Sequence, residues 1–204
     1  MSKKYNVYGI GNALVDIVTE VDDKFLIDHR IEKGLMTLVD EEFQERISNA
    51  INMNNSNKQC GGSAANSIIA VSQFGGSSYY SCKVANDALG EFYKEDLKNN
   101  GVDSNLNSES LEDGITGKCL VMTAEDASRT MNTFLGITGD YSRTEIIEAA
   151  LKDSQYLYIE GYLVTSENGQ DAMRYAKEMA EDNGVKTALT FSDPSMVKYF
   201  RDAM

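Results

Sequence analysis

Two polar residues near the start of the sequence are of the types that bind hydroxyl groups. Asn12 and Asp16 stand in GIGNALVDI, and Asp16 lies between the apolar residues Val15 and Ile17 in the mostly apolar run ALVDIVTEV. Burying a carboxylate without a partner costs several kcal/mol, so we expect Asp16 to face solvent or a ligand. A carboxylate can accept hydrogen bonds from two sugar hydroxyls. The simpler alternative is an Asp on the outward face of a strand.

A second group of candidate binding residues lies in GGSAANS, residues 61–67. Gly61 and Gly62 carry no Cβ atom, so backbone N–H groups at the mouth of a helix could closely approach a polar ligand. Asn66 follows one turn later and offers both a donor and an acceptor. This pattern favours a site for a hydroxyl-rich ligand. The alternative is an ordinary loop-to-helix junction with small packing residues.

Other phosphate-binding and metal-binding motifs are incomplete. GIGNAL begins like the dinucleotide fingerprint GxGxxG, but Leu14 replaces its third glycine. A P-loop ending at residues 117–118 would need Gly at 112 and Ser or Thr at 119, where the chain has Glu112 and Cys119. The single histidine, His29, has no His or Cys at ligand spacing, so no metal site is expected. The three cysteines form no CxxC pair, and we expect partly buried, reduced thiols.

Strands and helices alternate along most of the chain. Strands are predicted at 5–10, 13–21, 36–39, 77–84, 156–163 and 186–191, and helices at 22–29, 41–51, within 61–76, and at 87–100, 143–152, 167–183 and 195–204. The polar residues 52–59 are predicted to form a loop. This alternation is typical of a mostly parallel sheet covered by helices on both faces.

Two segments depart from the alternation. Residues 13–39 and 115–135 carry extra strands without long helices between them, and the second reads as a hairpin. We expect them to form a small accessory sheet inserted in a single domain spanning 1–204. The last predicted strand would leave an unpaired sheet edge, so either the fold ends there or the chain is truncated.

Composition narrows the class of protein. The 204 residues carry a net charge of −13, which argues against nucleic acid and anionic membranes as partners. The N-terminus lacks the apolar core of a signal peptide, and no stretch approaches the ~20 apolar residues of a membrane span. We therefore expect a cytoplasmic protein.

Taken in order, these segments resemble the ribokinase-type (PfkB) carbohydrate and nucleoside kinases. GIGNALVDI, GGSAANS and VSQFGG are similar to the opening of that family, GITGKCLVMTAEDASRTMNTFLG to its lid hairpin, and YIEGYL and LTFSDPSMV to its later core strands. The resemblance covers essentially the whole chain. It implies a three-layer α/β/α fold with a mostly parallel central sheet, in which the accessory sheet is a small β lid.

The resemblance also implies roles for particular residues. Asp16 would hold substrate hydroxyls with Asn12 beside it, and Gly61, Gly62 and Asn66 would contact the sugar ring. With these roles, the two stretches 12–16 and 61–66 would together form an acceptor-binding site.

The donor side of the site is only partly represented. Arg129 falls where the adenosine-kinase branch carries an arginine that reaches the phosphates, an exposed lid arginine being the alternative. The family's G-A-G-D-type loop, which supplies the aspartate base, would lie beyond Met204, so no catalytic residue and no metal ligand is expected in this chain. GITGD at 136–140 falls in the lid hairpin and is not that loop. Asp193 would face the donor phosphates or begin a helix beside Pro194.

The resemblance implies an ATP-dependent phosphotransferase that uses Mg²⁺ and acts on a hydroxyl of a sugar or nucleoside. The motifs lean toward the adenosine-kinase branch. This chain would carry the acceptor-binding half and be inactive by itself, and the lid would exclude water on closure. The alternative is a non-catalytic sugar- or nucleoside-binding module, or an inactive fragment of such a kinase. The family often uses the lid as a dimer interface, so a homodimer through it is compatible with the resemblance.

Overall fold

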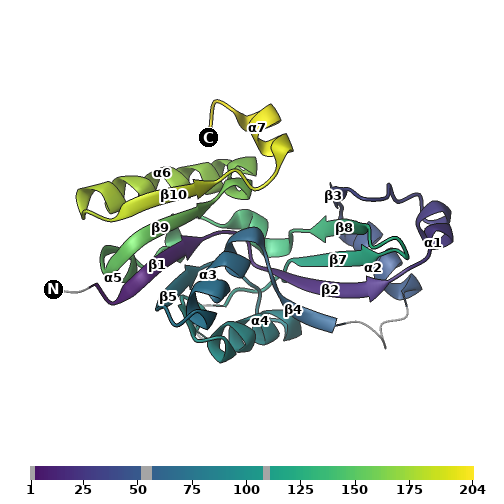
Figure 1. The fold of residues 1–204 in the computed structure, drawn as a ribbon, viewed down its shortest axis with the longest axis horizontal. Coiled ribbons are helices and arrows are strands. Elements are labelled where there is room, and N and C mark those ends of the chain that lie inside the picture. Colours follow the sequence, from purple (N-terminus) through teal and green to yellow (C-terminus); the bar gives the residue numbers. More distant parts are fainter. Residues whose placement is uncertain (1–2, 52–56, 108–110) are drawn as a thin grey trace.

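Two five-stranded sheets make up the computed structural model, which describes residues 3–51, 57–107 and 111–204 (Figure 1). The core sheet has the strand order β10-β9-β1-β5-β6, and the lid sheet has the order β3-β8-β7-β2-β4. The two sheets lie next to each other along the long axis of the molecule, and the chain crosses directly from β1 to β2.

The core sheet is parallel throughout. Its strands are β1 (Tyr5–Ile10), β5 (Ser78–Ser81), β6 (Val102–Ser104), β9 (Ser154–Glu160) and β10 (Lys186–Thr190). Helices cover both faces, with α3 (Ser63–Gln73) and α4 (Ala88–Asn99) on one and α5 (Glu148–Lys152) and α6 (Glu167–Asp182) on the other. The last helix is α7 (Pro194–Phe200). Together these layers form the predicted three-layer α/β/α arrangement.

The apolar run in β1 shows why this sheet forms. Val7 packs in the cluster under α3 and α4, whereas Tyr8 and Ile10 pack in the cluster under α6. A strand that is buried on both faces needs apolar side chains in both directions. A nearly continuous apolar sequence is the result.

The lid sheet is mixed and carries one long hairpin. Its strands are β2 (Leu14–Glu20), β3 (Met36–Leu38), β4 (Asn57–Gly61), β7 (Lys118–Thr123) and β8 (Arg129–Phe134), with helices α1 (Asp23–Asp28) and α2 (Glu41–Ala50) beside them. Strands β7 and β8 are antiparallel, as the hairpin prediction required. Asp22 and Asp40 cap the two helices by accepting hydrogen bonds from the N–H groups of Phe25 and Phe43.

Several predicted boundaries were wrong. The polar residues 57–59, predicted as loop, begin the exposed edge strand β4, while 52–56 lie outside the described residues. Composition cannot reveal the start of such a strand, because the backbone of residues 57–59 pairs with β2 while their side chains are exposed. The short strand β6 was missed for want of a periodic pattern.

Two further elements are shorter than predicted. The strand expected at 156–163 runs from Ser154 to Glu160, and Gly161–Thr165 form a 3₁₀ turn. The helix expected at 143–152 is split into a 3₁₀ turn, Arg143–Glu145, and α5. It is split because the backbone at residues 146–147 is extended.

No helix in the described part of the chain is long and apolar enough to cross a lipid bilayer.

Candidate functional site

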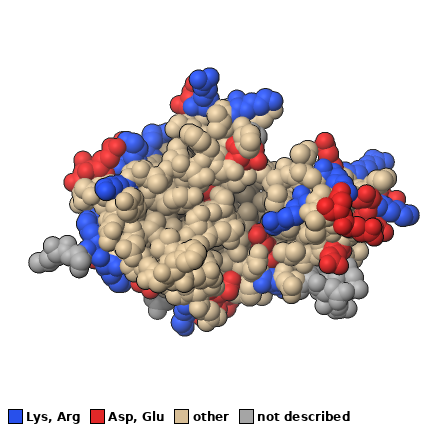
Figure 2. Space-filling view, viewed as in Figure 1, with Lys and Arg blue, Asp and Glu red and all other residues tan. Residues whose placement is uncertain are grey.

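A cavity of about 270 Å³ opens where the carboxyl ends of the core strands meet the lid sheet. The surface is visibly hollowed between the two sheets (Figure 2). The core side of the cavity is formed by the residues after β1, the start of α3 and the end of β9, and the lid side by β2, β3, β7 and β8. Ligands of open parallel sheets commonly bind at this edge.

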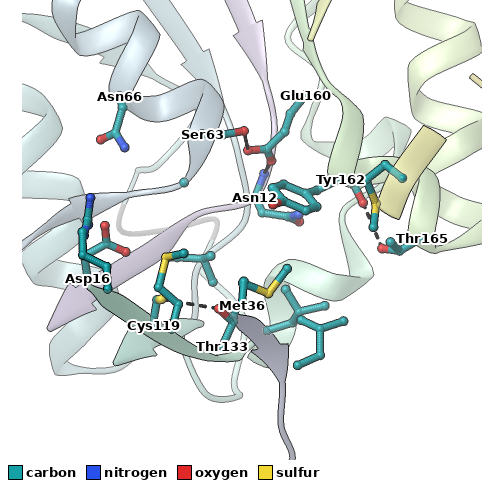
Figure 3. Close-up of a pocket in the computed structure, with 17 residues that line it drawn as sticks. Asn12, Asp16, Met36, Ser63, Asn66, Cys119, Thr133, Glu160, Tyr162 and Thr165 are labelled. Carbon is teal, nitrogen blue, oxygen red and sulfur yellow. Dashed lines mark hydrogen bonds between the residues drawn. The ribbon is translucent and has the colours of Figure 1, made fainter. Parts of the chain in front are cut away.

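Asp16 reaches this cavity from β2. Its neighbours Val15 and Ile17 are buried on the opposite face of the strand, so the alternation of side chains turns Asp16 toward the cavity, where it is half-buried (Figure 3). The carboxylate makes no hydrogen bond to another described residue. Burial raises its pKa to about 6, and the positive charge of Arg129 opposes that rise.

Gly61 and Gly62 make room for the polar groups at the site. A Cβ atom on Gly61 would overlap the Asp16 carboxylate, and one on Gly62 would overlap the backbone oxygen of Asn12. Gly62 also has φ 103°, a conformation that disfavours other residues, and it begins α3. The glycine pair therefore lets β4, β2 and α3 converge on the cavity.

Asn12 and Asn66 approach the cavity from different elements. Asn12 is buried, its N–H donates to Glu160 Oε2 at 2.5 Å, and its carbonyl accepts from the Tyr80 hydroxyl at 3.0 Å. Both backbone groups are thus satisfied within the protein. Asn66 lies one turn into α3 and is exposed on the side that lines the cavity (Figure 3).

Glu160, at the end of β9, is a site residue that the sequence reasoning missed. It is 0 % exposed and accepts hydrogen bonds from Asn12 N, from Ser63 Oγ at 2.5 Å and from Ala64 N at 3.1 Å. Burial raises its pKa, and these hydrogen bonds oppose the rise. The argument used for Asp16 could have found it, because it is also a carboxylate within an apolar strand.

The lid side of the cavity is mostly apolar. Its apolar lining comprises Leu14, Met36, Leu38, Met131 and Leu135. Cys119 on β7 lies among them and accepts a hydrogen bond from the Thr133 hydroxyl. All three cysteines are buried and unpaired, which confirms the prediction of free thiols.

The fold brings nearly all the expected site residues to one place. Five line the cavity: Asn12, Asp16, Gly62, Asn66 and Arg129. Gly61 lies directly behind Asp16 rather than in the lining. Neither Asp140 nor Asp193 lines the cavity.

The residues that could hold ATP and Mg²⁺ can be tested against the structure. Arg129, exposed at the start of β8, is a cation in the cavity lining and fits a phosphate group. Within residues 3–51, 57–107 and 111–204, no group of three or more His, Cys, Asp or Glu side chains is arranged to hold a metal ion. Among the described residues, Arg129 therefore fits a phosphate group.

Comparison with known proteins adds to this geometry. Residues 36–204 match the family described as pfkB family carbohydrate kinase. Adenosine kinase 2 of Arabidopsis thaliana is 24% identical over 198 residues, which are 95% of this chain and 57% of that protein.

Solved structures of kinases are also similar to this chain. The structure of adenosine kinase from Sinorhizobium meliloti has a TM-score of 0.88 and 34% identity, covering 97% of this chain and 60% of that one. A probable sugar kinase from Rhizobium etli CFN 42 has a TM-score of 0.89 and 29% identity, covering 98% and 60%. The chain thus spans about 57% to 60% of the length of these relatives. These likenesses confirm the ribokinase-like fold.

Proposed function

The chain belongs to the pfkB family of carbohydrate kinases, and on that premise we propose that its cavity binds the acceptor of an ATP-dependent phosphotransferase. The acceptor is a nucleoside, held by its ribose hydroxyls. Asp16 accepts hydrogen bonds from two hydroxyls, and Asn12, Asn66 and the backbone at Gly62 contact the ring.

The unpaired carboxylate of Asp16 is the observation that carries this proposal. It faces the cavity, is half-buried, and has no hydrogen-bond donor among the described residues. Retaining such a group costs free energy in the unliganded protein unless a ligand supplies donors. Adjacent sugar hydroxyls supply two donors at the right spacing for one carboxylate.

The apolar lid supports a nucleoside over a free sugar. Met36, Leu38, Met131 and Leu135 would face whatever extends from the sugar toward the lid. Methionine side chains pack well on aromatic rings, so a flat base suits this wall. A second sugar or a bare hydroxyl would leave the wall without a partner.

For catalysis, ATP supplies the phosphoryl group when it is bound. Arg129 would bind a donor phosphate, and closure of the lid sheet would keep water from the reaction. We expect residues 1–204 by themselves to bind the acceptor without transferring phosphate. Incubation with ATP, Mg²⁺ and adenosine should yield no AMP, and AMP formation would contradict this expectation.

Calorimetric titration of residues 1–204 with adenosine and with ribose tests the binding proposal. Adenosine should bind more tightly than ribose, and Asp16→Asn should weaken adenosine binding at least about tenfold, the effect of losing charge-assisted hydrogen bonds. Asp182→Asn, exposed on α6, is the matched control and should leave the affinity unchanged. Equal affinities of the wild type and Asp16→Asn would refute the proposal.

The pH dependence sharpens this test. Because the ionised carboxylate is the better acceptor, adenosine affinity should rise as the pH increases through about 6 and then level off. In Asp16→Asn this rise should disappear.

A non-catalytic binding module is the second candidate function, because the residues that line the cavity account for binding of an acceptor without any catalytic step. It predicts the same binding results for this chain. Phosphoryl transfer by the product of the natural gene decides between the two.

A further inference from the structure

The carboxylate of Glu160 occupies the N-terminus of α3, on the core side of the acceptor cavity (Figure 3). Gly62, the N-cap residue of α3, has no side chain that could cap the helix. Glu160 supplies the cap instead, from the end of β9 and 96 positions along the chain from Ala64. Its Oε1 accepts from Ser63 Oγ and Ala64 N, and its Oε2 accepts from Asn12 N.

This carboxylate takes the place where an anion would otherwise bind. A helix N-terminus attracts anions because its peptide dipoles and free N–H groups give it a partial positive charge. At the start of α3 these donors are already directed at Glu160, and a carboxylate held by several donors is favoured in its ionised form. A negatively charged group on a ligand would therefore meet a like charge at this end of the cavity.

The other charged groups of the lining do not offset Glu160. Among the described residues that line the cavity, the charged ones are Asp16, Arg129 and Glu160. Arg129 is exposed on the lid, and its positive charge acts on Asp16, where it opposes the rise in pKa. Since these two charges balance each other, Glu160 leaves the lining with one excess negative charge. Its repulsion of an anion is strong because the group is buried away from bulk water.

We propose that Glu160 restricts the acceptor cavity to uncharged ligands, so that a nucleoside binds and its 5′-phosphate is rejected. This inference rests on the function proposed above, because it concerns the same cavity. Glu160 has no exposed surface, so it acts without touching the ligand. It acts through its charge, and it also holds Asn12 and Ser63 in place.

Rejection of charged ligands has a consequence for the proposed reaction. Transfer of a phosphoryl group to a hydroxyl adds about two negative charges to the acceptor. The product would then carry the charge that Glu160 repels, whereas the substrate does not. Because product release limits the turnover of many enzymes, a site with this preference would favour the exchange of product for new substrate.

Calorimetric titration of the native chain with two adenosine derivatives separates charge from size. AMP carries about two negative charges at its 5′ position, whereas 5′-O-sulfamoyladenosine carries an uncharged group of similar size there. The sulfamoyl derivative should bind at least about tenfold more tightly than AMP, because only AMP is repelled. Equal affinities, or tighter binding of AMP, would overturn the proposal without the need for any variant.

A pair of variants assigns the preference to Glu160. In Glu160→Gln, the preference for the sulfamoyl derivative over AMP should shrink at least about fivefold. Glu167→Gln is the matched control and should keep the native preference. Glu167 also stands in the first turn of a helix, α6, but it is exposed and is not among the described residues that line the cavity.

The ratio of the two affinities is the decisive quantity. Loss of hydrogen bonds at the start of α3 would weaken both ligands alike and leave the ratio unchanged, whereas loss of the charge improves AMP binding alone. An unchanged ratio in folded Glu160→Gln would therefore overturn the proposal. If that variant does not fold, Glu160→Ala tests the same ratio, because its smaller side chain leaves space for water beside the donors of α3.

This proposal and the acceptor function fail in different ways. Equal binding of adenosine by the native chain and Asp16→Asn would refute the acceptor function. Adenosine binding that depends on Asp16, together with an affinity ratio that does not depend on Glu160, would refute only the role of Glu160.

Discussion

The core sheet and the lid sheet each have five strands, but they differ in which of their faces are buried. The core sheet is parallel, and helices cover both of its faces. The lid sheet is mixed, packs its α2 side into the apolar cluster shared with α3 and α4, and leaves its other face to the acceptor cavity. The core sheet thus buries both of its faces, whereas the lid sheet buries one face and lines the acceptor cavity with the other.

The polar groups of the two regions differ in the same way. In the core, buried Ser81 bonds to the Tyr141 hydroxyl and to the carbonyl of Glu145, and Glu160 accepts its hydrogen bonds at the strand end. Within the described residues, three buried side-chain atoms lack a partner, on Gln44, Ser128 and Asn132, and all belong to the lid.

This contrast indicates that the lid satisfies its buried polar groups less completely than the core does. The half-buried, unpaired Asp16 is part of the same pattern. The lid sheet is therefore expected to have lower local stability than the core sheet. The following changes test the contrast, from the largest expected effect to the smallest.

A matched pair of truncations tests the difference in packing. Leu157→Ala, in the middle of β9 with no exposed surface, should lower the free energy of unfolding by about 3–4 kcal/mol because it leaves a cavity in the core. Met131→Ala, half-buried on β8, should cost less than about 1 kcal/mol. Urea unfolding of both variants measures the two losses of unfolding free energy. Equal losses would contradict the proposed difference in packing between the two sheets.

Asp16→Asn should stabilise the unliganded chain at neutral pH. The pKa of this carboxyl rises from 3.8 to about 6 on folding, so the folded state holds the proton more tightly than the unfolded state. Stability from this group is full below the unfolded value and is lost as the pH rises toward 6, by about 2–3 kcal/mol. Asparagine does not ionise, so the Asp16→Asn variant should not lose this stability as the pH rises.

Thermal unfolding of both proteins between pH 4 and 8 measures the effect. The variant's advantage should grow up to about pH 6 and stay constant above it. A variant less stable than the wild type at pH 7 would mean that Asp16 is paired in the unliganded protein.

Gly61→Ala should damage the junction between the two sheets. The new Cβ would overlap the Asp16 carboxylate, and such overpacking typically costs about 1–3 kcal/mol. Adenosine affinity should fall with it, since Asp16 must move. Gly139→Ala is the control, because its Cβ would meet only Leu135, at 3.6 Å and beyond. Calorimetry and urea unfolding should separate the two variants.

Asn132→Leu should change stability least, within about 1 kcal/mol and in the stabilising direction, because it removes an unsatisfied buried donor. Replacing a satisfied core group gives the contrast. Ser81→Ala should destabilise by about 1–2 kcal/mol, since it leaves the Tyr141 hydroxyl with one partner fewer. A destabilised Asn132→Leu would show that the lid amide has a partner after all.

The sequence by itself determined much of this protein. The order of the main strands and helices follows from periodicity, and Asp22 and Asp40 begin helices because their side chains cap local N–H groups. Asp16 and the glycine pair were recognisable as site residues because a carboxylate in an apolar strand and paired glycines are each unusual on local grounds.

Only the tertiary structure decided what these residues meet. Glu160 accepts from Asn12, 148 positions away, and from Ser63, 97 positions away, and neither contact follows from local pattern. Strand β4 exists because its backbone pairs with β2, not because of its polar side chains. Periodicity reports which face of an element is buried, but which distant element covers that face depends on how the whole chain packs.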